Sequence, residues 1–210
     1  MSRTYAMLLS SLVALFVLAP IVKRFPAMVP LLDLAFTSAL LSALWTAAVE
    51  RREFRIGLLL AIPTVGSRWL IYGADGEVVE LARIGLPLLF FVYTTGRLLA
   101  AVVRERSVTR DTISGGISVY LLLGFCWALA YAFVERAAPG SLTGEAFDPT
   151  AFGSFLYFSF VTLTTLGYGE ITPASLTARM MCAGEAITGP LYLAILVARL
   201  VAMELTSRER

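Results

Sequence analysis

The chain has 210 residues, 58% of them hydrophobic and only 15% charged, and its mean hydropathy is +0.80. Soluble domains are roughly 45–50% apolar and about 25% charged, so this composition indicates a protein of the lipid bilayer. The net charge of +2 is too small to indicate a nucleic-acid partner. Because the chain has no histidine, it lacks the commonest metal ligand and acid–base catalyst, and we expect neither an enzyme nor a bound cofactor.

Six segments are read as membrane-spanning helices, which need about 20 largely apolar residues each. They cover roughly residues 4–22, 28–49, 56–72, 78–103, 117–134 and 178–205. The first segment lacks a clear cleavage site, so we read it as a spanning helix rather than a signal peptide. The predicted fold is therefore an all-α membrane protein with six transmembrane helices.

Two further features divide the second half of the chain. Residues 107–116 are polar and contain Gly115-Gly116, which is typical of a linker between a four-helix domain, residues 1–110, and a second domain, residues 111–210. A short apolar stretch, residues 150–163, predicts a re-entrant helix because it is too short to cross the bilayer. Asp148 can cap the first amides of this helix, and Pro149 is tolerated at its first position.

A glycine-rich motif follows that helix: Thr164-Thr165-Leu166-Gly167-Tyr168-Gly169-Glu170. Glycine accepts positive φ values that other residues avoid, so Gly-Tyr-Gly can turn successive carbonyl groups in one direction. After a short apolar helix and before a spanning one, the motif resembles the selectivity filter of the tetrameric potassium channels. The resemblance covers about residues 117–205, which makes residues 111–210 the expected pore domain; for residues 1–110 it extends only to the number of spans.

The resemblance implies which atoms bind potassium ions. The ion sites are expected to be lined by the Thr165 hydroxyl group and by the carbonyl groups of Thr165, Leu166, Gly167 and Tyr168, with Gly169 as the last filter residue. Thr164 is expected just below or behind these sites. Leu166 replaces the valine that is commoner in the family and supplies the same carbonyl group. Glu170 replaces the commoner aspartate, and its longer carboxylate can hydrogen-bond differently behind the filter.

The filter is expected to have supports on the neighbouring helices. Glu185 is an ionisable residue at membrane depth, which is costly and therefore indicates a functional role. We expect it to hydrogen-bond to the re-entrant helix through Ser159 or Thr162 and to stiffen the filter; a protonated glutamate between subunits is the alternative. We expect Tyr157, Phe158 and Phe160 to form an aromatic cuff behind the filter. Plain packing or lipid contact is the alternative.

The last span resembles the inner helix of these channels. Gly189 follows Gly169 by twenty residues, the spacing at which related channels have a glycine hinge. Pro190 comes next, and because proline bends a helix, Gly189-Pro190 predicts a gating hinge, with a static kink as the alternative. Leu193 and Val197 are expected to line an apolar cavity or inner constriction; packing between helices is the alternative.

The fourth span lacks the pattern of a voltage sensor, which carries several arginines at every third position. Its arginines, Arg83, Arg97 and Arg104, lie fourteen and seven residues apart, so we expect weak or absent voltage dependence. Asp33 and Arg68 are expected to pair with Arg97 or Arg83. Arg199 is expected to snorkel to the inner surface, or to pair with Glu204 or with a neighbouring subunit.

Basic residues in the loops predict the orientation, because short loops rich in Lys and Arg stay in the cytoplasm. This bias places both termini inside the cell and the glycine-rich motif near the outer face. Lys23 and Arg24 oppose this assignment, as does Arg136. The residues that support it are basic on the inner side, Arg3, Arg51, Arg52, Arg55, Arg104, Arg106, Arg110, Arg208 and Arg210, and acidic on the outer side, Asp75, Glu77 and Glu80.

These observations predict a homotetrameric, six-span, potassium-selective channel of the cell membrane. Its expected partners are K⁺ ions, the lipid bilayer and further copies of the chain. A weakly selective cation channel and a non-conducting regulatory subunit are the alternatives. A secondary transporter fits less well, because transporters often contain two related halves with broken helices and this sequence has one re-entrant segment.

Overall fold

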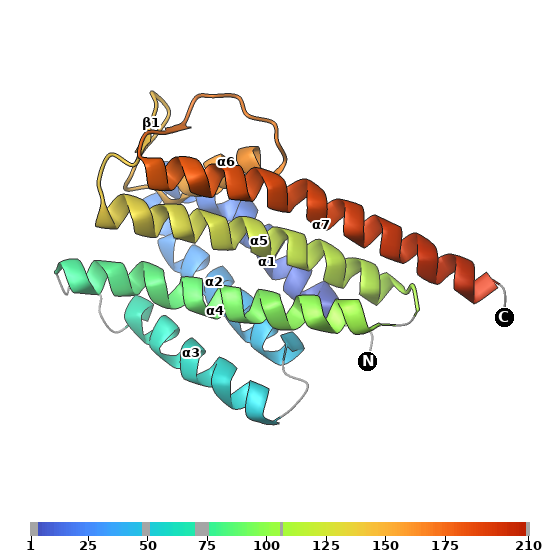
Figure 1. The fold of residues 1–210 in the computed structure, drawn as a ribbon. Helices are drawn as coiled ribbons and strands as arrows, with labels where there is room; N and C mark the ends of the chain where they lie inside the picture. Colours follow the sequence, from blue (N-terminus) through green and yellow to red (C-terminus); the bar gives the residue numbers. More distant parts are fainter. Residues whose placement is uncertain (1–3, 48–50, 70–75, 106, 209–210) are drawn as a thin grey trace.

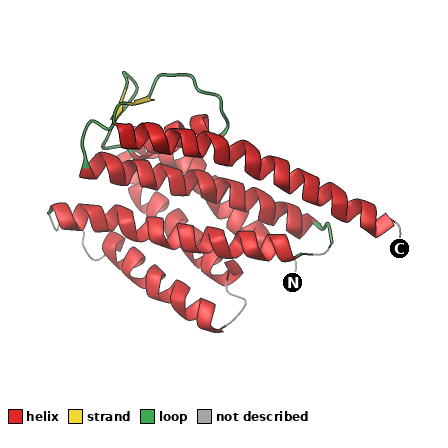
Figure 2. Cartoon of the chain, in the orientation of Figure 1, coloured by secondary structure: helices red, strands yellow, loops and turns green. Residues whose placement is uncertain are grey.

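The computed structural model describes residues 4–47, 51–69, 76–105 and 107–208. Almost all described elements are helices (Figure 2). They are α1 (Thr4–Arg24), the 3₁₀ helix η1 (Pro26–Met28), α2 (Val29–Ala47), α3 (Arg51–Trp69), α4 (Glu77–Arg104), α5 (Arg110–Ala137), α6 (Phe152–Leu163) and α7 (Leu176–Arg208). Two short strands, β1 (Leu142–Thr143) and β2 (Thr172–Pro173), pair in antiparallel fashion.

The helices form one bundle with its irregular loops gathered at one end (Figure 1). That end carries β1, β2 and the glycine-rich motif between α6 and β2. The beginning of α1, the end of α7 and the connection from α4 to α5 lie at the opposite end. Both ends of the described chain therefore lie away from the motif. Arg3, Asp75, Arg106 and Arg210, which contribute to the predicted orientation, lie outside the described residues, as do the side chains of Lys23, Arg24, Glu77 and Arg208.

Three of the described helices are long and apolar enough to cross a membrane: Val78–Arg104, Arg110–Ala137 and Leu176–Leu205. Tyr5–Ile21, Pro30–Thr46 and Phe152–Leu163 are apolar but shorter. The third predicted span differs most, because α3 begins at Arg51 instead of residue 56 and so includes Arg51, Arg52 and Arg55. These arginines lower its hydropathy. The helical class is confirmed, with three candidate spans, whereas the count of six stays a prediction.

The predicted linker is wrong from residue 110 onward, because α5 begins there. The Thr109 hydroxyl group accepts a hydrogen bond from the Thr112 amide at 3.1 Å and caps the helix. The pair Gly115-Gly116 lies inside the helix where its neighbours come close. A Cβ at Gly115 would lie 3.0 Å from Val102 of α4, and one at Gly116 would lie 3.0 Å from Leu196 of α7. Close helix packing, rather than a chain break, therefore explains this glycine pair.

The predicted start of the re-entrant helix is also wrong. α6 begins at Phe152, and its N-cap residue, Ala151, has no side-chain hydrogen bond. Asp148 instead accepts hydrogen bonds from the amide and the hydroxyl group of Thr150, at 2.9 Å and 2.6 Å. An aspartate that bonds to the backbone two residues later stabilises a turn. Asp148 therefore stabilises the loop before α6 rather than the helix itself.

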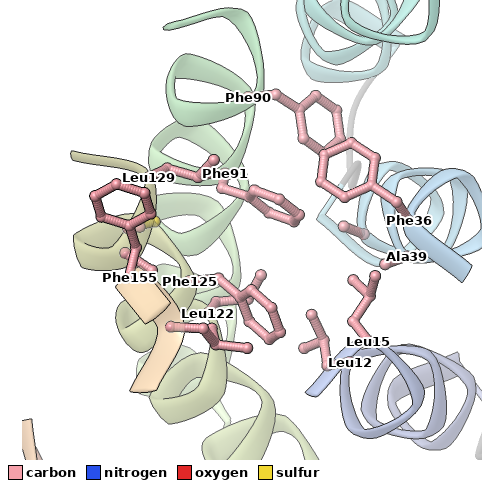
Figure 3. Packing of buried hydrophobic residues seen from close by; sticks show 14 of the residues in the cluster. Leu12, Leu15, Phe36, Ala39, Phe90, Phe91, Leu122, Phe125, Leu129 and Phe155 are labelled. Atoms are coloured by element: carbon pink, nitrogen blue, oxygen red, sulfur yellow. The ribbon is translucent and has the colours of Figure 1, made fainter. Parts of the chain in front are cut away.

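The buried core joins helices from both halves of the chain (Figure 3). Phe91 of α4 lies 5.5 Å from Phe36 of α2 and 6.2 Å from Phe125 of α5, measured between ring centroids. Phe160 of α6 lies 4.9 Å from Phe16 of α1 and 6.2 Å from Phe125. Between helices in a membrane, such contacts stabilise the fold through van der Waals packing rather than through removal of apolar surface from water. Residues 1–110 thus pack directly against the region that holds the motif; the division at residue 110 stays a prediction.

The arginines of α4 bind neighbouring carboxylates. Arg97 forms an ion pair with Glu53 of α3, a partner that sequence reasoning did not consider. Arg83 forms an ion pair with Glu80, one turn earlier in α4, at 2.8 Å. Asp33 is buried, and the side chain of Arg68 lies outside the described part of the chain.

Candidate functional site

The backbone of the glycine-rich motif alternates in handedness. Thr165, Gly167 and Gly169 have φ values of 58°, 59° and 82°, whereas Leu166 and Tyr168 are not among the residues with positive φ. Alternation of this kind allows successive carbonyl groups to turn toward one side of the chain. Glycine occupies two of the three positive-φ positions without strain. Thr165 is the described non-glycine residue with positive φ, and its conformation costs roughly 1–2 kcal/mol.

Hydrogen bonds to α6 hold the strained backbone in place. The Thr165 amide donates to the Thr162 carbonyl group at 2.9 Å. The Leu166 and Gly167 amides both donate to the Val161 carbonyl group, at 2.9 Å and 3.2 Å. Three successive amides of the motif therefore point back to the last turn of α6. The hydroxyl group of Thr164 donates to the Phe160 carbonyl group at 2.7 Å, which agrees with a position behind the expected ion sites.

The face of the motif is open in a single chain. All residues from Thr164 to Glu170 are exposed, and Leu166 and Tyr168 retain 55% and 64% of their accessible surface. A Cβ at Gly167 or Gly169 would have no atom within 4 Å. The motif therefore leaves space on the side away from α6 for an ion or for further subunits.

A hydrogen bond links the end of the motif to α6. The Tyr157 hydroxyl group donates to Glu170 Oε2 at 2.8 Å. This hydrogen bond raises the pKa of the Tyr157 phenol, because a deprotonated Tyr157 could no longer donate to the Glu170 carboxylate. Slight desolvation raises the pKa further. Tyr157 therefore remains a donor over the ordinary pH range. Phe158 is buried against Tyr131 of α5, 4.8 Å between ring centroids.

The third residue of the expected aromatic cuff lies elsewhere. Phe160 packs against α1 and α5, and a Cβ at Gly124 would lie 2.5 Å from the Phe160 ring. The prediction that Phe160 supports the filter is wrong because consecutive helical positions point in different directions. Tyr157 and Phe158 lie on the parts of α6 that contact Glu170 and Tyr131, whereas Phe160 faces the rest of the bundle.

A loop before α6 braces the outer end of the motif. Gly144 has a φ of 146°, and a Cβ there would lie 2.0 Å from the Glu170 carbonyl oxygen, so only glycine fits. The buried Glu135 carboxylate accepts hydrogen bonds from the Gly140 and Leu142 amides, at 2.8 Å and 2.9 Å. Sequence reasoning missed Glu135, although an acidic residue at the end of an apolar span was a usable signal. A surface hollow of about 670 Å³ is lined by Gly144, Glu145, Ala146, Gly169 and Glu170.

Glu185 of α7 contacts both α5 and α6. Ser159 Oγ lies 2.6 Å from Glu185 Oε1, so the predicted hydrogen bond with Ser159 is present. The other predicted partner, Thr162, instead lies 3.9 Å from Cys182 Sγ. The Tyr131 hydroxyl group donates to Glu185 Oε2 at 2.7 Å, a contact that sequence reasoning missed because Tyr131 is 54 residues away.

The predicted hinge lies where α7 touches α6. A Cβ at Gly189 would lie 1.9 Å from the Leu163 carbonyl oxygen, so packing alone requires glycine there. α7 continues through Pro190 as one helix. Leu193 and Val197 retain 41% and 58% of their surface, which leaves them open in a single chain. The hinge and pore-lining roles stay predictions.

Arg199 binds the end of α4. Its Nη2 atom donates to the Glu105 carbonyl group at 2.9 Å and also to the Val103 carbonyl group. Within this chain Arg199 thus has backbone partners on α4, and its pairing with Glu204 or with another subunit stays a prediction. Carbonyl groups in the last turn of a helix lack helical partners, which makes them good acceptors for an arginine.

The elements that build this site also match a known family. Residues 117–205 match the sequence model of the family described as "Ion channel". Two curated relatives each match less than half of the chain. "Two pore potassium channel c" of Oryza sativa subsp. japonica is 33% identical over 93 residues, 42% of this chain and 20% of the relative. "Two-pore potassium channel 4" of Arabidopsis thaliana is 33% identical over 91 residues, 43% of this chain and 29% of the relative.

The match is confined to part of each protein. The chain spans less than a third of the length of either relative, and no solved structure matches it. The family match over residues 117–205 and the two relatives together support the predicted resemblance to potassium channels. With the candidate spans, it supports a multi-pass membrane protein. The family and both relatives are described as channels, in agreement with the prediction that the chain is not an enzyme.

Proposed function

We propose that the chain is one subunit of a potassium-selective channel in the cell membrane. In this proposal, the Thr165 hydroxyl group and the carbonyl groups of Thr165, Leu166, Gly167 and Tyr168 replace the water shell of K⁺. The hydroxyl and carbonyl oxygens suit this role because hard cations prefer oxygen ligands.

The observation that carries the proposal is the backbone of residues 165–169. Its alternating φ values permit carbonyl groups to face one side, and three of its amides are already bonded to α6. At residues 165–167, carbonyl oxygens are then the backbone groups left to face an ion. This backbone lies within residues 117–205, which match an ion-channel family.

A homotetramer follows from the geometry of such a filter. Four loops around one axis form the potassium filter of known channels, and these 210 residues contain one such motif. Four copies would cover the exposed faces of Leu166 and Tyr168 and would turn Leu193 and Val197 toward a common cavity. The two relatives are named two-pore channels, which makes a dimer the alternative assembly. A measurement of the number of subunits must therefore distinguish a tetramer from a dimer.

Weak or absent voltage dependence and cytoplasmic termini complete the proposal. Arg83 and Arg97 of α4 each have a carboxylate partner, Glu80 and Glu53, instead of forming a ladder of regularly spaced charges. The beginning of α1 and the end of α7 lie at the end of the bundle opposite the motif (Figure 1). This arrangement supports the proposal that the motif is near the outer face and that both of these helix ends are on the cytoplasmic side.

Ion flux through liposomes tests the function. The purified protein is reconstituted and uptake of K⁺ and of Na⁺ is compared; we expect K⁺ uptake to exceed Na⁺ uptake at least about tenfold. Gly167→Ala, at a φ of 59°, should abolish the uptake, because alanine there is strained. Gly96→Ala is the matched control, since a Cβ at Gly96 meets no atom within 4 Å.

Other outcomes identify the alternative functions. Similar uptake of both ions would indicate a weakly selective cation channel. No uptake from correctly folded protein would indicate a non-conducting subunit and would refute the proposal. Cross-linking in detergent, followed by mass measurement, distinguishes a tetramer from a dimer. Currents recorded over a range of voltages in symmetric potassium test the voltage dependence, and a steep conductance–voltage curve would contradict it.

A further inference from the structure

Glu185 is completely buried, and no described residue forms an ion pair with it. Its relative exposure is 0%. The ion pairs found among the described residues are Arg83–Glu80 and Arg97–Glu53, and neither includes Glu185. A buried carboxylate without a cation is so costly that such groups usually remain neutral instead. Burial alone therefore favours the protonated acid.

The polar contacts around Glu185 cannot all be hydrogen bonds unless the Glu185 carboxyl group carries a proton. Ser159 Oγ lies 2.6 Å from Glu185 Oε1 and also 2.8 Å from the Gly124 carbonyl oxygen. A serine hydroxyl group has one proton to donate. If Glu185 were ionised, one of these two oxygen–oxygen contacts would have no proton between its atoms and would be repulsive.

A proton on Glu185 Oε1 satisfies every group. Glu185 then donates to Ser159, and Ser159 donates to the Gly124 carbonyl group. Tyr131 donates to Oε2, the remaining carboxyl oxygen, at 2.7 Å. The chain of donors runs from α7 through α6 to α5 with no atom left without a partner, which is the condition under which buried polar networks stabilise a fold.

In the part of the chain that the structure describes, the titratable neighbours of Glu185 are tyrosine and cysteine side chains. The titratable groups that interact electrostatically with Glu185 are Tyr131 and Tyr120 of α5 and the Cys182 thiol of α7. Ser159 is the group that α6 contributes to this network. Tyrosine and cysteine are ordinarily neutral at neutral pH. The Tyr131 and Ser159 hydroxyl groups are dipoles that could each donate to an ionised Glu185, but no cation among the described residues is paired with it.

We propose that Glu185 is a neutral carboxylic acid whose proton fixes α6 between α5 and α7, and that Glu185 thereby acts as a positioning residue for the motif. Ser159 lies on α6 only one turn before Thr162, whose carbonyl group accepts from the Thr165 amide at 2.9 Å. Loss of the proton would replace an attractive contact with Ser159 by a repulsive one. The effect on conduction rests on the proposed channel function, whereas the protonation state does not.

Infrared spectroscopy tests the protonation state directly. Protein labelled with ¹³C-glutamate is measured at neutral pH in lipid, and the spectrum of Glu185→Gln is subtracted. We expect a protonated carboxyl band in the difference spectrum that shifts with the label. Only carboxylate bands would overturn the proposal. Glu105→Gln is the matched control, because the Glu105 side chain is exposed and should contribute a carboxylate band.

Variants test the positioning role. Gln can accept from Tyr131 and donate to Ser159 as the neutral acid does, so Glu185→Gln should retain K⁺ uptake within about twofold and lose its pH dependence. Glu185→Ala leaves Tyr131 and Ser159 without their partner and should reduce uptake at least about tenfold. Equal losses in both variants would overturn the positioning role, since a neutral donor at residue 185 would then be insufficient.

The pH dependence has a definite sign. A proton that the folded protein holds and the unfolded chain releases stabilises the fold more at low pH, so stability falls as pH rises. Wild-type protein should lose thermal stability and K⁺ uptake together as the carboxyl band disappears at alkaline pH. Glu185→Gln should show neither loss. If the carboxyl band is present but neither the wild type nor a variant takes up K⁺, the channel function is wrong and the neutral Glu185 stands. If K⁺ uptake is normal but the carboxyl band is absent, the neutral Glu185 is wrong and the channel function stands.

Discussion

The Leu163 carbonyl oxygen and Gly189 are packed so closely that a Cβ at residue 189 would lie 1.9 Å from that oxygen. Leu163 is the last residue of α6, immediately before the motif, and Gly189 is near the middle of α7. A contact this close between two backbones fixes the height of α6 relative to α7. The same glycine that the sequence predicts as a hinge is therefore a packing residue in this structure.

Gly189→Ala tests this contact. The added methyl group must push α6 away from α7, which costs roughly 1–3 kcal/mol of unfolding free energy for overpacking. We expect lower thermal stability in detergent and reduced K⁺ uptake. Gly96→Ala, which introduces the same methyl group into open space on α4, should change neither. Wild-type stability in Gly189→Ala would contradict the packing role and leave only the hinge.

Tyr157→Phe tests the bond between α6 and the end of the motif. It removes the hydroxyl group that donates to Glu170 at 2.8 Å while it keeps the aromatic ring. We expect selectivity for K⁺ over Na⁺ to fall by about threefold or more, since the outer end of the motif loses a fixed contact. The same ratio of K⁺ to Na⁺ uptake in wild type and variant would show that the bond does not affect selectivity.

Glu135→Ala should loosen the loop that packs on the motif. The carboxylate accepts from two amides, and hydrogen bonds to charged groups contribute about 1.5–3 kcal/mol each. We expect faster amide hydrogen exchange at Gly140 and Leu142. Glu135→Gln keeps one acceptor oxygen and should give an intermediate effect. Unchanged exchange in both variants would argue against Glu135 as the brace of this loop.

Arg199→Ala should release the end of α4 from α7. The guanidinium group donates to the Val103 and Glu105 carbonyl groups, so its loss leaves two carbonyl groups without a donor. We expect hydrogen exchange to rise in residues 102–105 and to remain unchanged in α6. Arg104→Ala, at an exposed neighbouring position, is the control. An equal rise in both variants would mean that general loss of charge, not this contact, is responsible.

Sequence spacing predicted a contact between neighbouring elements better than contacts between distant ones. The spacing of α6, the motif and α7 placed Glu185 near Ser159, and that hydrogen bond is present. Helix ends were less predictable: Asp148 resembles a helix cap but stabilises its own turn. The partners of Arg97 and Arg199 depend on which helices are neighbours, and spacing along one helix does not contain that information. Tyr131 was missed for the same reason.

The amides of Thr165, Leu166 and Gly167 all donate to carbonyl groups of α6. Chloride and other anions bind proteins through free amide donors, and these three are occupied. At these positions the loop can offer an ion only oxygen atoms. If the proposed channel function holds, a single chain therefore already disfavours anions at these three positions, and selection among cations would depend on the assembly of several chains.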